Sequence, residues 1–248
     1  MRKLIILMLS VASVASGQPT HKFPPDSLTN TQVIPRSTPV IEVVGMMRNF
    51  TSALGVRCTF CHVGSEGEDL AEYDFASDQK RNKLVARQML RMLAEVNARL
   101  DTIPGRTHPA VTATCMTCHH GVSRPVPLAT LIQETTVAVS ADSALSAYKV
   151  LREKYYGKDS YDFSEGSLNI AAFRIARAGK VSDALKILDY NETLYPKSSG
   201  MSVFRGNILL MKGDTTAAET AFREAIRRDS TNNEAKGRLK AIGKAPPK

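Results

Sequence analysis

Two pentapeptides of the form C-x-x-C-H are the residues whose types and spacing point most directly to chemistry. The cysteines and histidines are Cys58, Cys61 and His62 in the first motif and Cys115, Cys118 and His119 in the second. Such a motif attaches haem c: its two thiols add to the two vinyl groups, and the imidazole that follows binds the iron. The two motifs use all four cysteines of the chain. The sequence therefore predicts two covalently bound haem c groups.

Other uses of paired cysteines fit this pattern less well. Two C-x-x-C pairs that share one zinc ion are usually separated by about 15–20 residues, and Cys61 lies much further than that from Cys115. Zinc also needs no histidine directly after each pair. Two local disulfides or a thioredoxin-like pair would leave both histidines unexplained. Haem is the favoured interpretation, and zinc and disulfides remain the alternatives.

A haem held by one histidine needs a sixth ligand, unless an open site serves catalysis. Methionine sulfur suits this position, and each motif is preceded by a helical stretch that carries two candidates. These are Met46 and Met47 before the first motif and Met89 and Met92 before the second. The alternative is that they are ordinary core methionines. His108 lies in a loop before the second motif and is a further candidate for a distal ligand.

The N-terminus carries the features of an export signal. A basic start is followed by an apolar run from Leu4 and then by small residues up to Gly17, which predicts a signal peptide over residues 1–17. A retained membrane anchor is the alternative, but the apolar run is short for a membrane span. We therefore expect a periplasmic or secreted protein with no lasting membrane anchor. Haem propionates offset much of the formal charge of +9, so we expect redox protein partners and no nucleic acid.

The elements that must position these motifs are helical, and the predicted fold class is all-α. Residues 18–38 are rich in Pro, Thr and Ser and predict an extended tether, and residues 39–127 form the predicted haem region. Within it we expect helices over 39–53 and 78–100, the second with one buried apolar face. Residues 126–140 are the expected interdomain connection, and residues 141–242 are expected to form a second, helical domain.

The haem region resembles the photosynthetic reaction-centre cytochrome c subunit family and its non-photosynthetic relatives. The resemblance covers residues 39–127 and rests on the stretches 47–62, 74–78, 86–92 and 115–121, together with Asn97 and Arg124-Pro125. It implies that each haem unit consists of a helix, a turn and a C-x-x-C-H helix, and that two units pack as a pair. By motif position it implies Met47 as the distal ligand of the first haem and Met89 as that of the second. That subunit carries four haems and often a lipid-anchoring cysteine, whereas this chain has one pair of motifs, so photosynthesis is not implied.

The C-terminal region contains a weak internal repeat. Gly179, Ala184 and Leu188 recur as Gly213, Ala218 and Phe222 with an offset of 34 residues. This period is similar to that of tetratricopeptide (TPR) repeats, which are pairs of antiparallel helices. Asn191 does not fit the repeat. Such an array often presents a groove to a protein partner, but a structural cap or an oligomerisation surface is an equally open interpretation.

Together these features predict an electron-transfer protein and no enzyme. The leading hypothesis is a periplasmic dihaem cytochrome that carries single electrons between redox partners, with a TPR-like domain that docks a partner. A second hypothesis is an enzyme similar to dihaem peroxidases, in which one iron keeps an open site. A third is an assembly or sensory protein in which haem reports the redox state.

Overall fold

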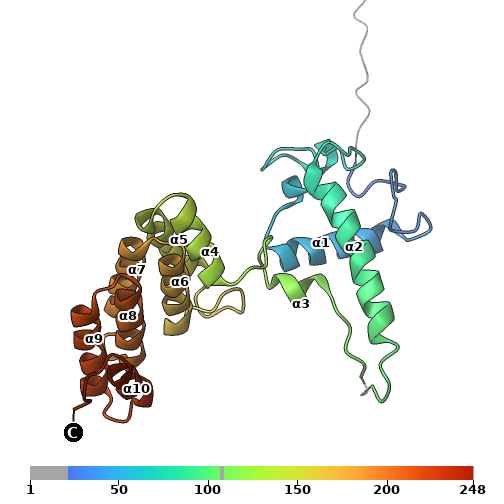
Figure 1. Ribbon diagram of the computed structural model, residues 1–248. Helices are drawn as coiled ribbons and strands as arrows, with labels where there is room; N and C mark the ends of the chain where they lie inside the picture. Colours follow the sequence, from blue (N-terminus) through green and yellow to red (C-terminus); the bar gives the residue numbers. More distant parts are fainter. Residues whose placement is uncertain (1–21, 107–108, 248) are drawn as a thin grey trace, which may run out of the picture. The chain divides into compact units, whose positions relative to one another are not determined.

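The structure is a computed structural model that describes residues 22–106 and 109–247. Over these residues the chain forms ten α-helices and no β-sheet (Figure 1), which confirms the predicted all-α class. Contacts divide the chain into an N-terminal unit that ends at Cys115 and a C-terminal unit that begins at Met116. The predicted signal peptide lies outside the described residues. No helix among the described residues combines the length and the apolar character needed to cross a membrane.

The N-terminal unit contains two long helices, α1 (Val40–Leu54) and α2 (Arg81–Leu100). Helix α1 ends at Gly55, which has the left-handed φ of 64° that glycine adopts without strain. Helix α2 begins three residues later than predicted. The reason is that Lys80 is extended and that the Asp78 side chain binds Lys83 and Arg87 on α2 itself, so residues 78–80 form the entry loop.

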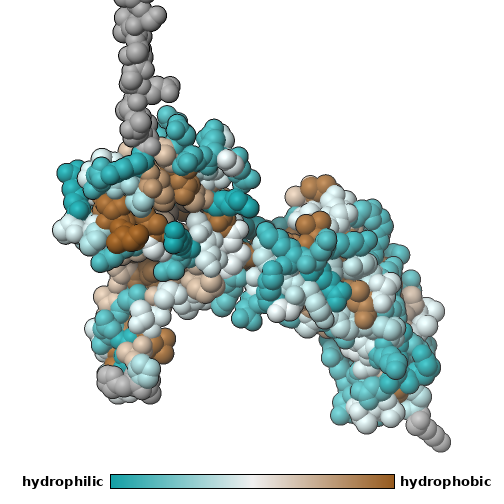
Figure 2. All heavy atoms as spheres, turned by 180° about the vertical axis from the view of Figure 1, so that it is seen from behind, coloured by the Kyte–Doolittle hydropathy of each residue, from teal (hydrophilic) through white to brown (hydrophobic). Residues whose placement is uncertain are grey.

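The N-terminal unit has almost no hydrophobic core of its own. Among its described residues only two apolar side chains are buried, Val43 and Ala53, both on α1. We predicted that α2 buries its apolar face, but protein contacts cover this face only in part. A stripe of side chains on this helix is 40–47% exposed, namely Leu84, Val85, Met89, Met92 and Val96. In Figure 2 apolar side chains, coloured brown, lie open on the surface of this unit.

Residues 22–38, the described part of the predicted tether, form no helix but are hydrogen-bonded to the unit. The Asn30 side-chain amide donates to the Ala76 carbonyl at 2.6 Å and to Asp78 Oδ1 at 2.9 Å. In return, Arg87 Nη2 donates to the Asn30 carbonyl at 3.0 Å. Asn30 has a positive φ of 53°, a conformation that asparagine tolerates better than most residues. This part of the chain is therefore anchored beside α2.

The C-terminal unit is a stack of helical hairpins. Its helices are α4 (Leu128–Ala138), α5 (Ala141–Tyr155), α6 (Glu165–Arg177), α7 (Val181–Leu194), α8 (Ser199–Met211), α9 (Thr215–Arg228) and α10 (Asn233–Ala241). Helix α4 packs on α5 and α6, α6 packs on α7 and α8, and α8 packs on α9, while α10 covers α9. Three hairpins and a final helix thus lie side by side in Figure 1.

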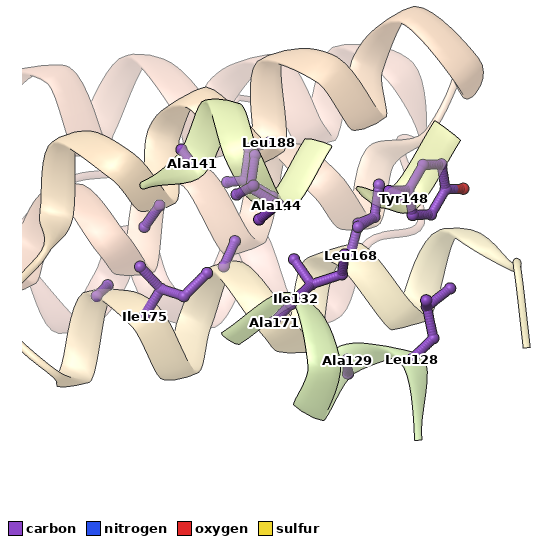
Figure 3. Packing of buried hydrophobic residues seen from close by; sticks show 14 of the residues in the cluster. Leu128, Ala129, Ile132, Ala141, Ala144, Tyr148, Leu168, Ala171, Ile175 and Leu188 are labelled. Atoms are coloured by element: carbon purple, nitrogen blue, oxygen red, sulfur yellow. The ribbon is translucent and has the colours of Figure 1, made fainter. Parts of the chain in front are cut away.

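The prediction that residues 126–140 form an interdomain connection was wrong, because most of this segment is helix α4. Leu128 and Ile132 on α4 are each only 1% exposed. Figure 3 shows how side chains of α4 meet those of α5, α6 and α7 in one core. The first hairpin, α4 and α5, also extends the array beyond the two repeats that the 34-residue offset revealed. The unit that contains this array starts at Met116 rather than at residue 141.

The residues of the internal repeat lie either in the turns between helices or in the buried core. Gly179 and Gly213 occupy the turns inside the second and third hairpins with φ values of 84° and 83°. Ala184, Leu188, Ala218 and Phe222 are completely buried between helices. Asn191, which fits the repeat poorly, is also completely buried, and its amide donates to the Glu165 carbonyl and to Asn169 Oδ1, each at 3.0 Å.

Candidate haem sites

The first C-x-x-C-H motif lies in a tight turn that α2 holds in place. Cys58–Phe60 form a 3₁₀ helix, and the His62 amide donates to the Cys58 carbonyl at 2.9 Å, so the motif makes one helical turn. The side-chain amide of Asn82 on α2 donates to the Phe60 carbonyl at 3.0 Å. Helix α2 therefore fixes the backbone between the two attachment cysteines.

His62 is held in its neutral form. Burial and, to a smaller extent, the charge of Lys83 lower its pKa to about 4 against the opposite effects of the Phe75 backbone and Asp74. Nδ1 of His62 is buried without a hydrogen-bond partner of good geometry. A neutral imidazole is the form that binds iron. Burial also raises the pKa of Cys61, so this sulfur stays a thiol before it reacts.

An aromatic cluster packs against His62. The Phe75 ring meets the imidazole edge-on with 5.0 Å between ring centroids, and it also contacts Tyr73 at 5.7 Å and Phe23 at 5.5 Å. The segment that carries Phe75 returns to the motif through a bridge between Val63 and Asp74. The return requires Gly64, because a Cβ there would lie 2.7 Å from the Tyr73 ring.

The second motif forms the short helix α3 (Cys115–His119), followed by a turn that orients its histidine. Nδ1 of His119 is hydrogen-bonded to the Val122 carbonyl at 2.9 Å. A proximal histidine that binds iron through Nε2 uses its other ring nitrogen in this way. The turn needs positive φ values at His120 (48°) and Gly121 (82°). Ser160 Oγ donates to the His120 carbonyl at 2.6 Å and holds the turn from outside.

The approach to the second motif is held by the far end of α2. The Asn97 side-chain amide donates to the Ala113 carbonyl at 3.0 Å, and its oxygen accepts from the Ala113 amide at 2.8 Å. One side chain thus satisfies both polar backbone groups of a residue two positions before Cys115. Asn82 and Asn97 are 15 residues apart on one helix, which corresponds to about 22 Å along its axis. Helix α2 therefore ties down the backbone at or beside both motifs.

A cavity of about 400 Å³ lies beside the second motif within the C-terminal unit. The residues that line it include His119 and His120 of the haem-binding segment and Ile170 and Arg174 of α6. The acidic side chain of Asp162 at its rim is engaged by Ser164 and Ser167. The cavity thus joins the haem-binding segment to the face of the second hairpin.

The residues present fit a porphyrin. Each motif supplies two thiols that are not in a disulfide and one imidazole, and the apolar stripe on α2 offers the contact surface that a porphyrin face needs. Fully covering an apolar side chain of this size contributes about 1.5–3 kcal/mol, so a unit that leaves five of them open lacks much of its stabilisation. No group of three or more His, Cys, Asp or Glu side chains within residues 22–106 and 109–247 could hold a metal ion.

The methionines predicted as distal ligands lie on the expected helices. The structure does not distinguish Met47 from Met46, or Met89 from Met92, as the ligand. Met47 on α1 is half-buried and its neighbour Met46 is exposed, while Met89 and Met92 both belong to the exposed stripe of α2. His108 lies outside the described residues. The assignment of Met47 and Met89, with Met46, Met92 and His108 as alternates, therefore stays a prediction.

Sequence reasoning did not assign roles to three polar residues of α2. Asn82 and Asn97 hold the backbone at the two motifs, and Lys83 binds three carbonyls next to Phe75. Asn97 contributed to the family resemblance without a known task. These polar residues lie on a helix that also has an apolar face. Polar residues of such a helix usually face solvent, so their contacts with the backbone near the motifs could not be predicted.

Comparison with known proteins supports the haem interpretation for part of the chain. A family model described as the photosynthetic reaction centre cytochrome C subunit matches residues 69–157. The matched range contains α2, the second motif, α4 and α5, and it ends beyond residue 127, where the resemblance was expected to stop. The first motif lies before it. No curated protein matches the chain. The match indicates haem c binding and is consistent with a role in electron transfer.

Proposed function

We propose that this chain is an exported dihaem c-type cytochrome that carries single electrons between redox proteins. The observation that carries the proposal is the combination of two complete attachment motifs with a unit whose main helix leaves its apolar face open. Protein covers this stripe only in part, and two porphyrins attached at the motifs would provide apolar surfaces of the right kind. When bound, haem c supplies one-electron chemistry at its iron.

The residues of the chain then have separate tasks. Four cysteines would attach the two porphyrins, and His62 and His119 would bind the two irons. Met47 and Met89 are the sixth ligands, and a methionine at this position favours electron transfer because it leaves no site for a substrate and raises the reduction potential. The helices α1 and α2 that carry these methionines each precede one of the two motifs in the sequence.

The stack of helical hairpins is the proposed docking domain. It resembles a TPR-like array in its hairpin order and in the glycine turns at Gly179 and Gly213, and such arrays bind protein segments on one face. The cavity between the second motif and α6 supports this role, because a partner bound at Ile170 and Arg174 would lie beside the haem-binding turn.

The proposal is tested by intact mass spectrometry of the denatured protein, purified from a bacterial host that attaches haem c. We expect the mass of the mature chain plus two haems. The double variants Cys58→Ala/Cys61→Ala and Cys115→Ala/Cys118→Ala should each retain one haem. A product without covalent porphyrin would refute the proposal, and a wild-type product with one haem would reduce it to a monohaem cytochrome.

The ligand assignment is tested by electron paramagnetic resonance and near-infrared magnetic circular dichroism. We expect two low-spin haems with methionine-to-iron charge-transfer bands, one of which is lost in Met47→Ala and the other in Met89→Ala. Bands that persist in both variants would refute these ligands, and the alternates Met46→Ala and Met92→Ala would then be measured. A high-spin wild-type haem that reacts with hydrogen peroxide would instead indicate a peroxidase-like enzyme.

A further inference from the structure

Lys83 has an unusual environment for a lysine. Its Nζ donates to the carbonyls of Phe75, Ala76 and Ser77 at 2.9, 3.0 and 2.8 Å, and it lies 3.2 Å from Asp78 Oδ1. The side chain is only 12% exposed. An ammonium group has three donors, and here three consecutive backbone carbonyls accept them. Lysine is rarely buried without such pairing, so the position points to a specific task.

The three carbonyls belong to the loop that packs on the first motif. Phe75, whose carbonyl Lys83 holds, contacts the His62 ring edge-on at 5.0 Å. The same loop is fixed at its start by the Asp74 carboxylate, which accepts from the amides of Ala76 and Ser77. Lys83 therefore fixes the loop from the side of α2, and the loop fixes the proximal imidazole through Phe75.

The charge of Lys83 is also felt at His62. The lysine lowers the pKa of this histidine, and its effect is larger than the opposite effect of Asp74. Asp78 is shared by Lys83 and Arg87, since Arg87 Nη1 donates to its second oxygen at 2.9 Å. Lys83 thus shares the Asp78 carboxylate with Arg87, and Asp74 is the opposing charge at His62.

We propose that Lys83 is a positioning residue for the first haem, which orients His62 through Phe75 and raises the reduction potential of the iron by its charge. The proposal rests on the proposed function. Reduction of an iron centre by one electron lowers its charge by one, so a nearby cation stabilises the reduced form.

The test is a potentiometric titration of the holoprotein and of its variants, followed by haem absorbance and electron paramagnetic resonance. The first haem is identified by comparison with Cys115→Ala/Cys118→Ala, which lacks the second. In Lys83→Met we expect the potential of the first haem to fall and its resonance to broaden as the orientation of His62 becomes less uniform. The second haem should titrate as in the wild type. Lys83→Arg, which keeps the charge, should recover most of the potential.

Two further variants keep the test decisive if Lys83→Met does not mature. Asp78→Asn removes the negative partner while Lys83 keeps its three carbonyls, so the first haem should shift to higher potential. Lys186→Met removes one positive charge from an exposed ion pair with Asp142 in the C-terminal unit, and it should shift neither haem.

The outcomes separate the two proposals. An unchanged first-haem potential in Lys83→Met and in Asp78→Asn, with both haems attached, refutes the role of Lys83 and leaves the dihaem function intact. Equal shifts of both haems refute a local effect. A shift in Lys186→Met of the same size would show that only net charge matters. Absence of covalent haem in the wild type refutes the function itself and is detected beforehand by mass spectrometry.

Discussion

Among the described glycines of the hairpin stack, Gly206 on α8 is the most closely packed, and it gives a quantitative prediction. A Cβ added there would lie 2.4 Å from Cε1 of Phe222 on α9 and 2.7 Å from two further ring atoms. Carbon atoms normally approach to about 3.5–4.0 Å, so the ring would have to move by more than about 1 Å. Phe222 is completely buried. Overpacking of this kind costs about 1–3 kcal/mol.

The change to alanine also has a favourable part, because alanine is better than glycine inside a helix by about 0.5–1 kcal/mol. With three ring atoms in conflict, we place the overpacking near the top of its range, so that Gly206→Ala loses about 1–2 kcal/mol of unfolding free energy. The melting temperature of the stack should fall by several degrees. Gly237 on α10 is the matched control, since no atom lies within 4 Å of its added Cβ. Gly237→Ala should therefore gain about 0.5–1 kcal/mol.

The assay is thermal unfolding of the holoprotein by circular dichroism at 222 nm, with haem absorbance recorded in parallel to follow the N-terminal unit separately. A double variant, Gly206→Ala/Phe222→Leu, adds a check, because the smaller side chain makes room for the new methyl group. Its loss should be smaller than the sum of the two single losses. If Gly206→Ala proved as stabilising as Gly237→Ala, or if the two changes were simply additive, the packing described for α8 and α9 would be wrong.

The other predictions concern haem, the α2 anchor and pH. Protein produced without haem attachment should lose helical signal and protease resistance in the N-terminal unit while the C-terminal unit stays folded. Limited proteolysis measures the resistance of each unit, and equal resistance of both would contradict the prediction. Asn97→Ala should leave both backbone polar groups of Ala113 without these partners, so amide hydrogen exchange should become faster before the second motif and stay unchanged at the first. Unchanged exchange rates before the second motif would contradict the role of Asn97. The Arg227 and Arg228 side chains lower the pKa of Glu224 to about 2, so its contribution to stability is complete above about pH 4.5 and is lost as the pH falls through about 2. Glu224→Gln should therefore melt with a smaller difference between pH 5 and pH 3 than the wild type, and identical differences would contradict this.

The helical class and the main elements follow from sequence patterns. The helix predicted over 39–53 corresponds to α1, and its end at Gly55 follows from the left-handed conformation of that glycine. Gly179 and Gly213 similarly locate the turns of two hairpins. Helix α4 was missed because its segment starts after prolines and is rich in Thr and Val, which are weak helix formers. Its packing on α5 and α6 overrides this preference.

The attachment residues are a prediction from the spacing that a porphyrin requires, but their surroundings cannot be predicted in this way. The apolar periodicity of α2 is the same whether protein or porphyrin covers these side chains. Only the structure shows that protein leaves them partly exposed. The role of Lys83 depends on a loop that reaches it from residues 75–77, and no local pattern reveals such a contact. Asn191 appeared to be a misfit because its partners lie on another helix, α6.

The unequal distribution of buried apolar residues has a consequence for biogenesis. The hairpin stack has a hydrophobic core of its own, and we expect it to fold without haem. The preceding unit, which emerges first, has only Val43 and Ala53 buried in its described part, so it stays loosely packed until its cofactors arrive. The thiols consequently remain within reach of the enzymes that join porphyrin to protein. We expect a mutation that gave this unit a dense core of its own to stabilise the polypeptide and to slow the attachment of haem.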